Sequence, residues 1–171
     1  GGGVFAWDWD AAKGCAALKT NFDTEGLADF DLSLELEGLE LAKINAAMEA
    51  GRSDAIVEYG AFKSFGMKIA DEKLLDAVFD IAGLQMNQSG KDLRASAPAM
   101  IRLSGMQAAA LSPRIAGYVE AVAKFVEQGG VLEATARPSQ PVTFVALGVA
   151  AQAGPQTIPD TLNLTVTQKK K

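Results

Sequence analysis

Two acidic residues alternate with two tryptophans near the start of the chain, in the stretch Trp7-Asp8-Trp9-Asp10. Carboxylates in this spacing can hold a hard cation such as Ca²⁺, and carboxylates set between tryptophans can bind sugars. The structural alternative is a strand with hydrated carboxylates and packed indoles. We favour this alternative, because a single D-x-D pair supplies few of the six to eight oxygens that Ca²⁺ takes.

Most other catalytic chemistry is excluded by composition. The chain has no histidine, which removes Ser-His-Asp and Cys-His nucleophile systems and histidine-based zinc sites. The single cysteine, Cys15, cannot form a disulfide within the chain and is expected to be a buried or idle thiol. Asp71 and Glu72 form a close acidic pair, but they stand at an expected helix start, where acidic residues favour the helix dipole.

No nucleotide or nucleophile motif is present. The sequence lacks a Walker A loop, a G-x-G-x-x-G turn and a G-x-S-x-G elbow. A hydrolase that uses two separated carboxylates is the enzyme class that the sequence leaves open. The sequence therefore predicts no catalytic, cofactor-binding or metal-binding residue, no cofactor, and no identifiable ligand-binding residue.

The length and composition of the chain indicate one acidic globular domain. The 171 residues suit a single domain over 1–171 with a sizeable core. The net charge of −5 argues against nucleic acid as a partner, and no apolar run reaches the roughly 20 residues of a membrane span. Residues 1–3 and 169–171, Gly-Gly-Gly and Lys-Lys-Lys, resemble processed ends, so we expect a piece of a longer chain.

The stretch FDLSLELEGLEL, residues 30–41, alternates apolar and polar side chains until it slips by one position at Gly38. Period-two alternation predicts a strand, with Leu32, Leu34 and Leu36 facing the core. The slip indicates either a β-bulge at Gly38 or the end of the strand, followed by a helix over about 42–50. A pattern with one polar side argues for an antiparallel sheet with one solvated face. A long strand or hairpin, kinked near Gly60, is expected over 54–69. Further strands are expected at 4–9, 15–22, 131–136 and 162–167.

Helical periodicity occupies the middle of the chain. The first expected helix is capped by Asp71 and ends at Gly83, and the second starts at Ser89 and is kinked or restarted at Pro98. The third starts at Ser112-Pro113 and ends at Gly129-Gly130. A short fourth helix is expected over 142–152 and is stopped by Gly154-Pro155. Strands, then helices, then strands predict an α+β fold, with an antiparallel twisted sheet and several helices packed on one face. The helix stripes should be covered by the leucine face of the sheet, which predicts a closed core.

The spacing of small motifs over residues 72–166 points to a family. It runs Leu74…Ala82-Gly83…Leu93-Arg94…Met100, Ile115…Tyr118-Val119…Phe125-Val126…Gly129-Gly130-Val131-Leu132…Arg137-Pro138…Pro141-Val142, Leu162…Val166. This pattern resembles the C-terminal region of large, uncharacterised cell-envelope proteins of alphaproteobacteria. The resemblance covers about half the chain. It implies an exported module that faces the periplasm, and it carries no functional residues to this chain.

Three functional hypotheses follow. The first is a non-catalytic envelope module that binds a protein partner or forms part of an assembly, through strand edges available for pairing. The second is a carrier of an apolar ligand such as lipid, held by a curved sheet. The third is a carboxylate-based enzyme. The expected compartment is periplasmic or otherwise extracytoplasmic, with the cytoplasm as the alternative, and a closed core favours the first hypothesis over the second.

Overall fold

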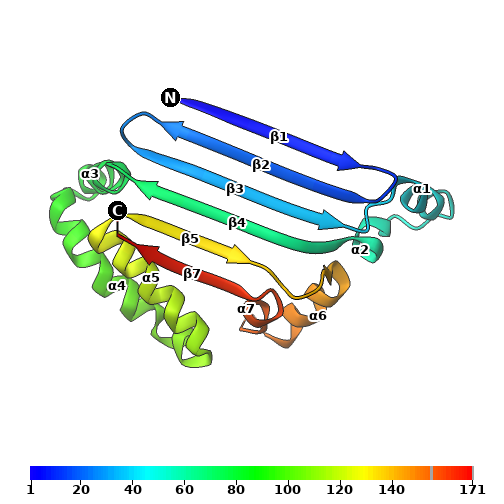
Figure 1. The fold of residues 1–171 in the computed structure, drawn as a ribbon. Helices are drawn as coiled ribbons and strands as arrows, with labels where there is room; N and C mark the ends of the chain where they lie inside the picture. Colours follow the sequence, from blue (N-terminus) through cyan, green and yellow to red (C-terminus); the bar gives the residue numbers. More distant parts are fainter. Residues whose placement is uncertain (155, 171) are drawn as a thin grey trace.

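The fold is α+β, as predicted, and consists of one antiparallel sheet with helices at its ends and on one face (Figure 1). The computed structural model describes residues 1–154 and 156–170. Pro155, expected to help stop a helix, and Lys171, part of the expected C-terminal end, lie outside the described residues. No helix within the described residues is both long enough and apolar enough to cross a membrane.

The sheet has seven strands in the order β1-β2-β3-β4-β5-β7, and the short β6 pairs with β4. Every pairing is antiparallel. The strands are β1 (Gly2–Asp10), β2 (Cys15–Thr24), β3 (Ala28–Glu37), β4 (Ala61–Asp71), β5 (Val131–Ala136), β6 (Val142–Thr143) and β7 (Leu164–Lys169). The first four strands therefore run as a meander, and the chain leaves the sheet for three helices before β5 returns beside β4.

The slip at Gly38 marks the end of β3, and the bulge alternative is wrong at that position. Gly38 has a φ of +76°, and a Cβ there would lie 1.9 Å from the carbonyl oxygen of Tyr59. Only glycine fits such a turn. A register shift does occur in the sheet, but between Glu35 and Leu36 of β3, where Lys63 of β4 is the extra residue.

Seven helices are described: α1 (Leu41–Glu49), α2 (Ala55–Tyr59), α3 (Leu74–Met86), α4 (Gly90–Leu111), α5 (Pro113–Gln128), α6 (Phe144–Ala153) and α7 (Thr157–Thr161). The start of α5 is the clearest confirmed prediction. The Ser112 hydroxyl accepts a hydrogen bond from the backbone N–H of Arg114 at 3.2 Å, and Pro113 follows at the first helical position, where a missing N–H costs nothing.

Several local expectations are wrong. Residues 55–59 form α2 instead of the first part of a long strand, so β4 begins at Ala61. The N-cap of α3 is Lys73, although Asp71 still accepts a hydrogen bond from the Leu75 N–H at 3.0 Å. Gly83 lies buried inside α3, which ends at Asn87 in the left-handed conformation. Of the two alternatives at Pro98, the restart is wrong, because α4 continues through this residue. The short α7 has no counterpart among the expected helices.

The main core lies between the helices and the second half of the sheet. It joins Leu75 of α3 and Phe125 of α5 to Leu132 of β5, with Ile69 of β4 and Val166 of β7 packed against it. A smaller cluster holds α1 against α2 through Ile44, Ala47 and Ala55. The main cluster therefore covers β4, β5 and β7, and neither cluster includes a described residue of β1, β2 or β3. The buried residues of these three strands are the small side chains Ala16 of β2 and Ala28 of β3.

Candidate functional site: an uncovered apolar sheet face

One face of the first three strands carries a continuous apolar surface. Residues paired across neighbouring strands share a face of the sheet, and the register pairs Trp7 with Leu18 and Leu18 with Leu34. We call this surface the open face; its residues are Phe5, Trp7, Trp9, Ala16, Leu18, Thr20, Phe22, Phe30, Leu32, Leu34 and Leu36.

The open face is exposed although it lies on the helix-bearing side of the sheet. Phe30 is paired with Ile69, whose side chain packs against the helical core, so the helices and the open face share one side. The exposed fractions are 67% for Phe5, 54% for Trp7 and 49% for Phe22. The expected closed core is therefore wrong for these strands. Figure 1 shows α4 and α5 at the β5–β7 side of the sheet, away from β1, and α3 at the end of the sheet near the β2–β3 turn.

An apolar pocket of about 260 Å³ deepens one end of the open face. The side chains that line it are all apolar and come from the sheet, from α1, from α2 and from the loop before α1; they are Trp7, Trp9, Ala16, Leu39, Leu41, Ile44 and Ile56. The indole N–H of Trp9 donates to the Leu39 carbonyl oxygen at 3.1 Å. This bond holds the indole against the loop and satisfies its one polar group.

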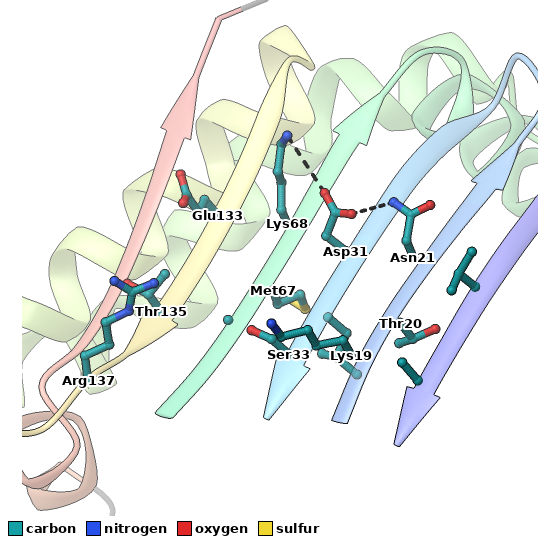
Figure 2. A pocket seen from close by; sticks show the side chains of 14 residues that line it. Lys19, Thr20, Asn21, Asp31, Ser33, Met67, Lys68, Glu133, Thr135 and Arg137 are labelled. Atoms are coloured by element: carbon teal, nitrogen blue, oxygen red, sulfur yellow. Dashed lines mark hydrogen bonds and ion pairs between the residues drawn. The ribbon is translucent and has the colours of Figure 1, made fainter. Parts of the chain in front are cut away.

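The opposite face of the sheet is polar and carries a hollow of about 520 Å³. Figure 2 shows the side chains that line it along β1 to β5. Asp31 lies near its centre, where it accepts a hydrogen bond from the Asn21 amide at 2.5 Å and pairs with the Lys68 ammonium at 3.9 Å. Lys19, Glu133 and Arg137 also line the hollow, so it carries side chains of both charges. Such a mixed, paired surface is typical of the hydrated side of a sheet.

The stretch Trp7-Asp8-Trp9-Asp10 of β1 forms no cation site within the residues that the structure describes. Asp10 accepts hydrogen bonds from the backbone N–H groups of Lys13 at 3.0 Å and Ala12 at 3.2 Å, and its carboxylate pairs with the Lys13 ammonium at 3.3 Å. The Lys13 N–H bond is the main reason that the pKa of Asp10 is lowered. Asp10 thus stabilises the β1–β2 turn. Asp8 lies opposite Ala17, so its parity places it on the polar face, away from the tryptophans.

The remaining candidates from the sequence do not form a described reactive cluster. No group of three or more potential ligands from Cys, Asp and Glu is placed to hold a metal ion among the described residues. Glu120 and Glu133 have lowered pKa values, caused mainly by hydrogen bonds from Arg102 and Lys169 respectively. A general acid needs the opposite shift. Cys15 is exposed instead of buried.

Sequence reasoning found the alternation in β1 and β3 but missed that their apolar side is uncovered. A signal was present in β1, where Phe5, Trp7 and Trp9 share one parity in a strand that contains only two charges, Asp8 and Asp10. Alternation of this kind shows which side chains share a face. It does not show which element packs against that face.

Comparison with known proteins gives a family and no close relatives. No curated protein matches the chain, and no solved structure matches it. A family model described as "Uncharacterized protein" matches residues 21–169, from β2 to the end of β7. Because this match covers most of the 171 residues, the chain belongs to the family that bears the description "Uncharacterized protein".

Proposed function

We propose that this chain is a non-catalytic binding module that holds a protein partner on the open face. The observation that carries the proposal is the exposure of four aromatic side chains, Phe5, Trp7, Trp9 and Phe22, on one sheet face. With side chains of about 150–250 Å² each, their exposed fractions amount to roughly 310–520 Å² of aromatic surface. The half-buried leucines of β3 add to this area. The largest apolar patch on a typical monomer measures about 300–600 Å² and is often functional.

The shape of the site favours a protein over a small ligand. Pockets for small molecules enclose most of the ligand surface and measure about 300–1,000 Å³. The open face is a broad surface, and its one apolar pocket measures about 260 Å³. A pocket of that size fits a single anchoring side chain. Protein interfaces concentrate their binding energy in such anchors, in aromatic residues above all.

The carrier of an apolar ligand is the second candidate. The observation that favours it is the purely apolar lining of the pocket beside Trp7 and Trp9, because apolar cavities remain dry and accept hydrocarbon groups. The carboxylate-based enzyme has less support. The carboxyl groups whose pKa departs from its ordinary value, Asp10, Glu120 and Glu133, are all shifted downward, so they remain ionised and cannot serve as general acids near neutral pH.

We include the cell envelope in the proposal. This part depends on the resemblance over residues 72–166, because neither the open face nor the family description indicates a compartment. Fractionation of cells that produce the natural protein, followed by detection of this region, tests it. Recovery with the cytoplasmic fraction would contradict the envelope assignment and would leave the binding site unaffected.

Photo-cross-linking tests the binding site with a matched pair of positions on one strand. A photoreactive phenylalanine analogue replaces Trp7, which lies on the open face, or its neighbour Ala6, which points to the other side. Irradiation in cells should join a protein other than a second copy of this chain to the Trp7 variant, and no such protein to the Ala6 variant. An adduct of lipid mass at Trp7 would favour the carrier. Equal adducts with another protein at both positions, or none with another protein at either, would contradict an interface on the open face.

A further inference from the structure

The outer edge of β1 is an unprotected template for strand pairing. β1 pairs with β2 through nine consecutive residues, from Gly2 opposite Asp23 to Asp10 opposite Cys15, with no register shift. It stands at the end of the strand order, and no described strand lies on its other side (Figure 1). Half of its backbone N–H and C=O groups therefore face outward.

Natural edge strands are usually protected by lysine, proline, a bulge or short length. β1 has no lysine, proline or bulge over its nine residues, and its charged side chains, Asp8 and Asp10, lie near its C-terminal end. The other end of the sheet differs, because β7 has six residues and ends with Lys169, whose ammonium pairs with Glu133 at 2.8 Å. The contrast singles out β1 as the edge that accepts another strand.

We propose that the strand added at this edge is β1 of a second copy, antiparallel about a two-fold axis at Ala6. This register pairs all nine residues, since each residue i then lies opposite residue 12 − i. It keeps the apolar side chains on one face and sets Phe5 opposite Trp7 twice. Aromatic cross-strand pairs of this kind stabilise sheets.

The flanking residues fit the same register. Trp9 falls opposite Gly3, which has no side chain. A Cβ at Gly3 would lie 2.5 Å from the ring of Phe22, so the ring lies beside Gly3 and can contact the incoming indole. Charges are compatible as well, because Asp8 faces Val4 and Asp10 faces Gly2, and no carboxylate faces another.

The dimer should be weak and reversible. The exposed parts of Phe5, Trp7 and Trp9 amount to about 300 Å² with side chains of about 150–250 Å² each. A standard interface buries about 800 Å² on each partner. Pairing at the edge covers the flanks of these aromatic side chains and leaves the leucines of β3, two strands away, uncovered. This inference does not rest on the proposed function, and each can fail without the other.

Single cysteines test the two-fold axis. In a Cys15→Ser background, Ala6→Cys places the two thiols at the axis, where Cα atoms about 4.5–5.5 Å apart lie within disulfide range. The control Val4→Cys places its thiols four residues apart along the strand, about 13 Å. Mild oxidation should link most of the Ala6→Cys chain into a species of twice 17.9 kDa and little of the control. Equal linking of the two variants, or none in either, would overturn the proposal.

Charged substitutions at Val4 give a second test that does not use cysteine. Val4→Lys should face Asp8 of the other copy and tighten the dimer, whereas Val4→Glu should loosen it. Two symmetric pairs of about 0.2–1 kcal/mol each correspond to about a 2- to 30-fold change in the dissociation constant. Sedimentation equilibrium measures both variants over a concentration series. A wild-type chain that remains monomeric at every concentration, or a reversed order of the two variants, would overturn the assigned pairing.

Discussion

Replacing phenylalanine by alanine at two positions separates the core from the open face. Phe125 is 5% exposed within the main core, and Phe5 is 67% exposed on β1. Phe125→Ala removes a buried ring and should lower the free energy of unfolding by about 3–5 kcal/mol. Phe5 has only a third of its side chain covered, about 50–80 Å². At about 25 cal/mol per Å², Phe5→Ala should cost about 1–2 kcal/mol.

Urea unfolding followed by far-UV circular dichroism measures both costs. The chain should be kept at low concentration, where the midpoint does not change with dilution, so that self-association does not contribute. The slope of the unfolding free energy against urea concentration should be similar in the wild-type chain and in both variants. In that case the substitutions act on stability and leave the surface exposed on unfolding unchanged. If Phe5→Ala destabilises the chain as much as Phe125→Ala, β1 is covered in the monomer and the open face does not exist.

Three further predictions concern the sheet. Leu34→Ala should cost about 1–2 kcal/mol in urea unfolding, below the 2–5 kcal/mol typical of a fully buried leucine, since Leu34 is half-buried; a larger loss would mean a covered β3. Gly38→Ala should cost more than about 1–2 kcal/mol, the strain of the left-handed region alone, because its Cβ would also meet the Tyr59 carbonyl oxygen; an unchanged melting temperature would refute this. Asp10 has a lowered pKa in the folded chain, so its stabilising effect is present above the unfolded pKa near 3.9 and is lost as the pH falls through the lower pKa of the folded chain. Asp10→Asn should therefore flatten the fall in melting temperature between about pH 5 and pH 3. A fall as steep as that of the wild-type chain would show that the Asp10 turn contributes nothing.

The parts of the fold that sequence predicts are those fixed by neighbours along the chain. Alternation in β3 identifies a strand because side chains change face at every residue. Ser112-Pro113 identifies the start of α5 because a side-chain cap and a fixed φ act within one helical turn. The α+β class follows from the order of such segments.

The parts that sequence misses depend on contacts between distant segments. Residues 55–59 alternate like a strand, but Ala55 is buried against α1, and five residues are too few for periodicity to separate a helix from a strand. Gly83 resembles a helix stop. It lies inside α3 because a Cβ there would come within 2.8 Å of the Gly90 backbone nitrogen at the start of α4. Its role is close packing between two helices.

The candidate site was hidden from sequence for the same reason. The leucines of β3 and the helix stripes each predict burial, and the simplest assumption pairs them with one another. The pairing of β4 with β5 instead brings the helices over β4, β5 and β7. The aromatic side of β1 and β2 is left without cover, although its residues share a face as the alternation predicts.

Tryptophan fluorescence tests the central claim most directly, because both tryptophans of the chain, Trp7 and Trp9, lie on the open face. Acrylamide quenching should be measured on the folded chain at low concentration and again in urea. With exposed fractions of 54% and 39% for the two residues, we expect that quenching of the folded chain reaches a substantial part of that of the unfolded chain, and that a bound partner protects both indoles. A folded chain whose emission is blue-shifted and almost insensitive to acrylamide would mean that the open face is buried.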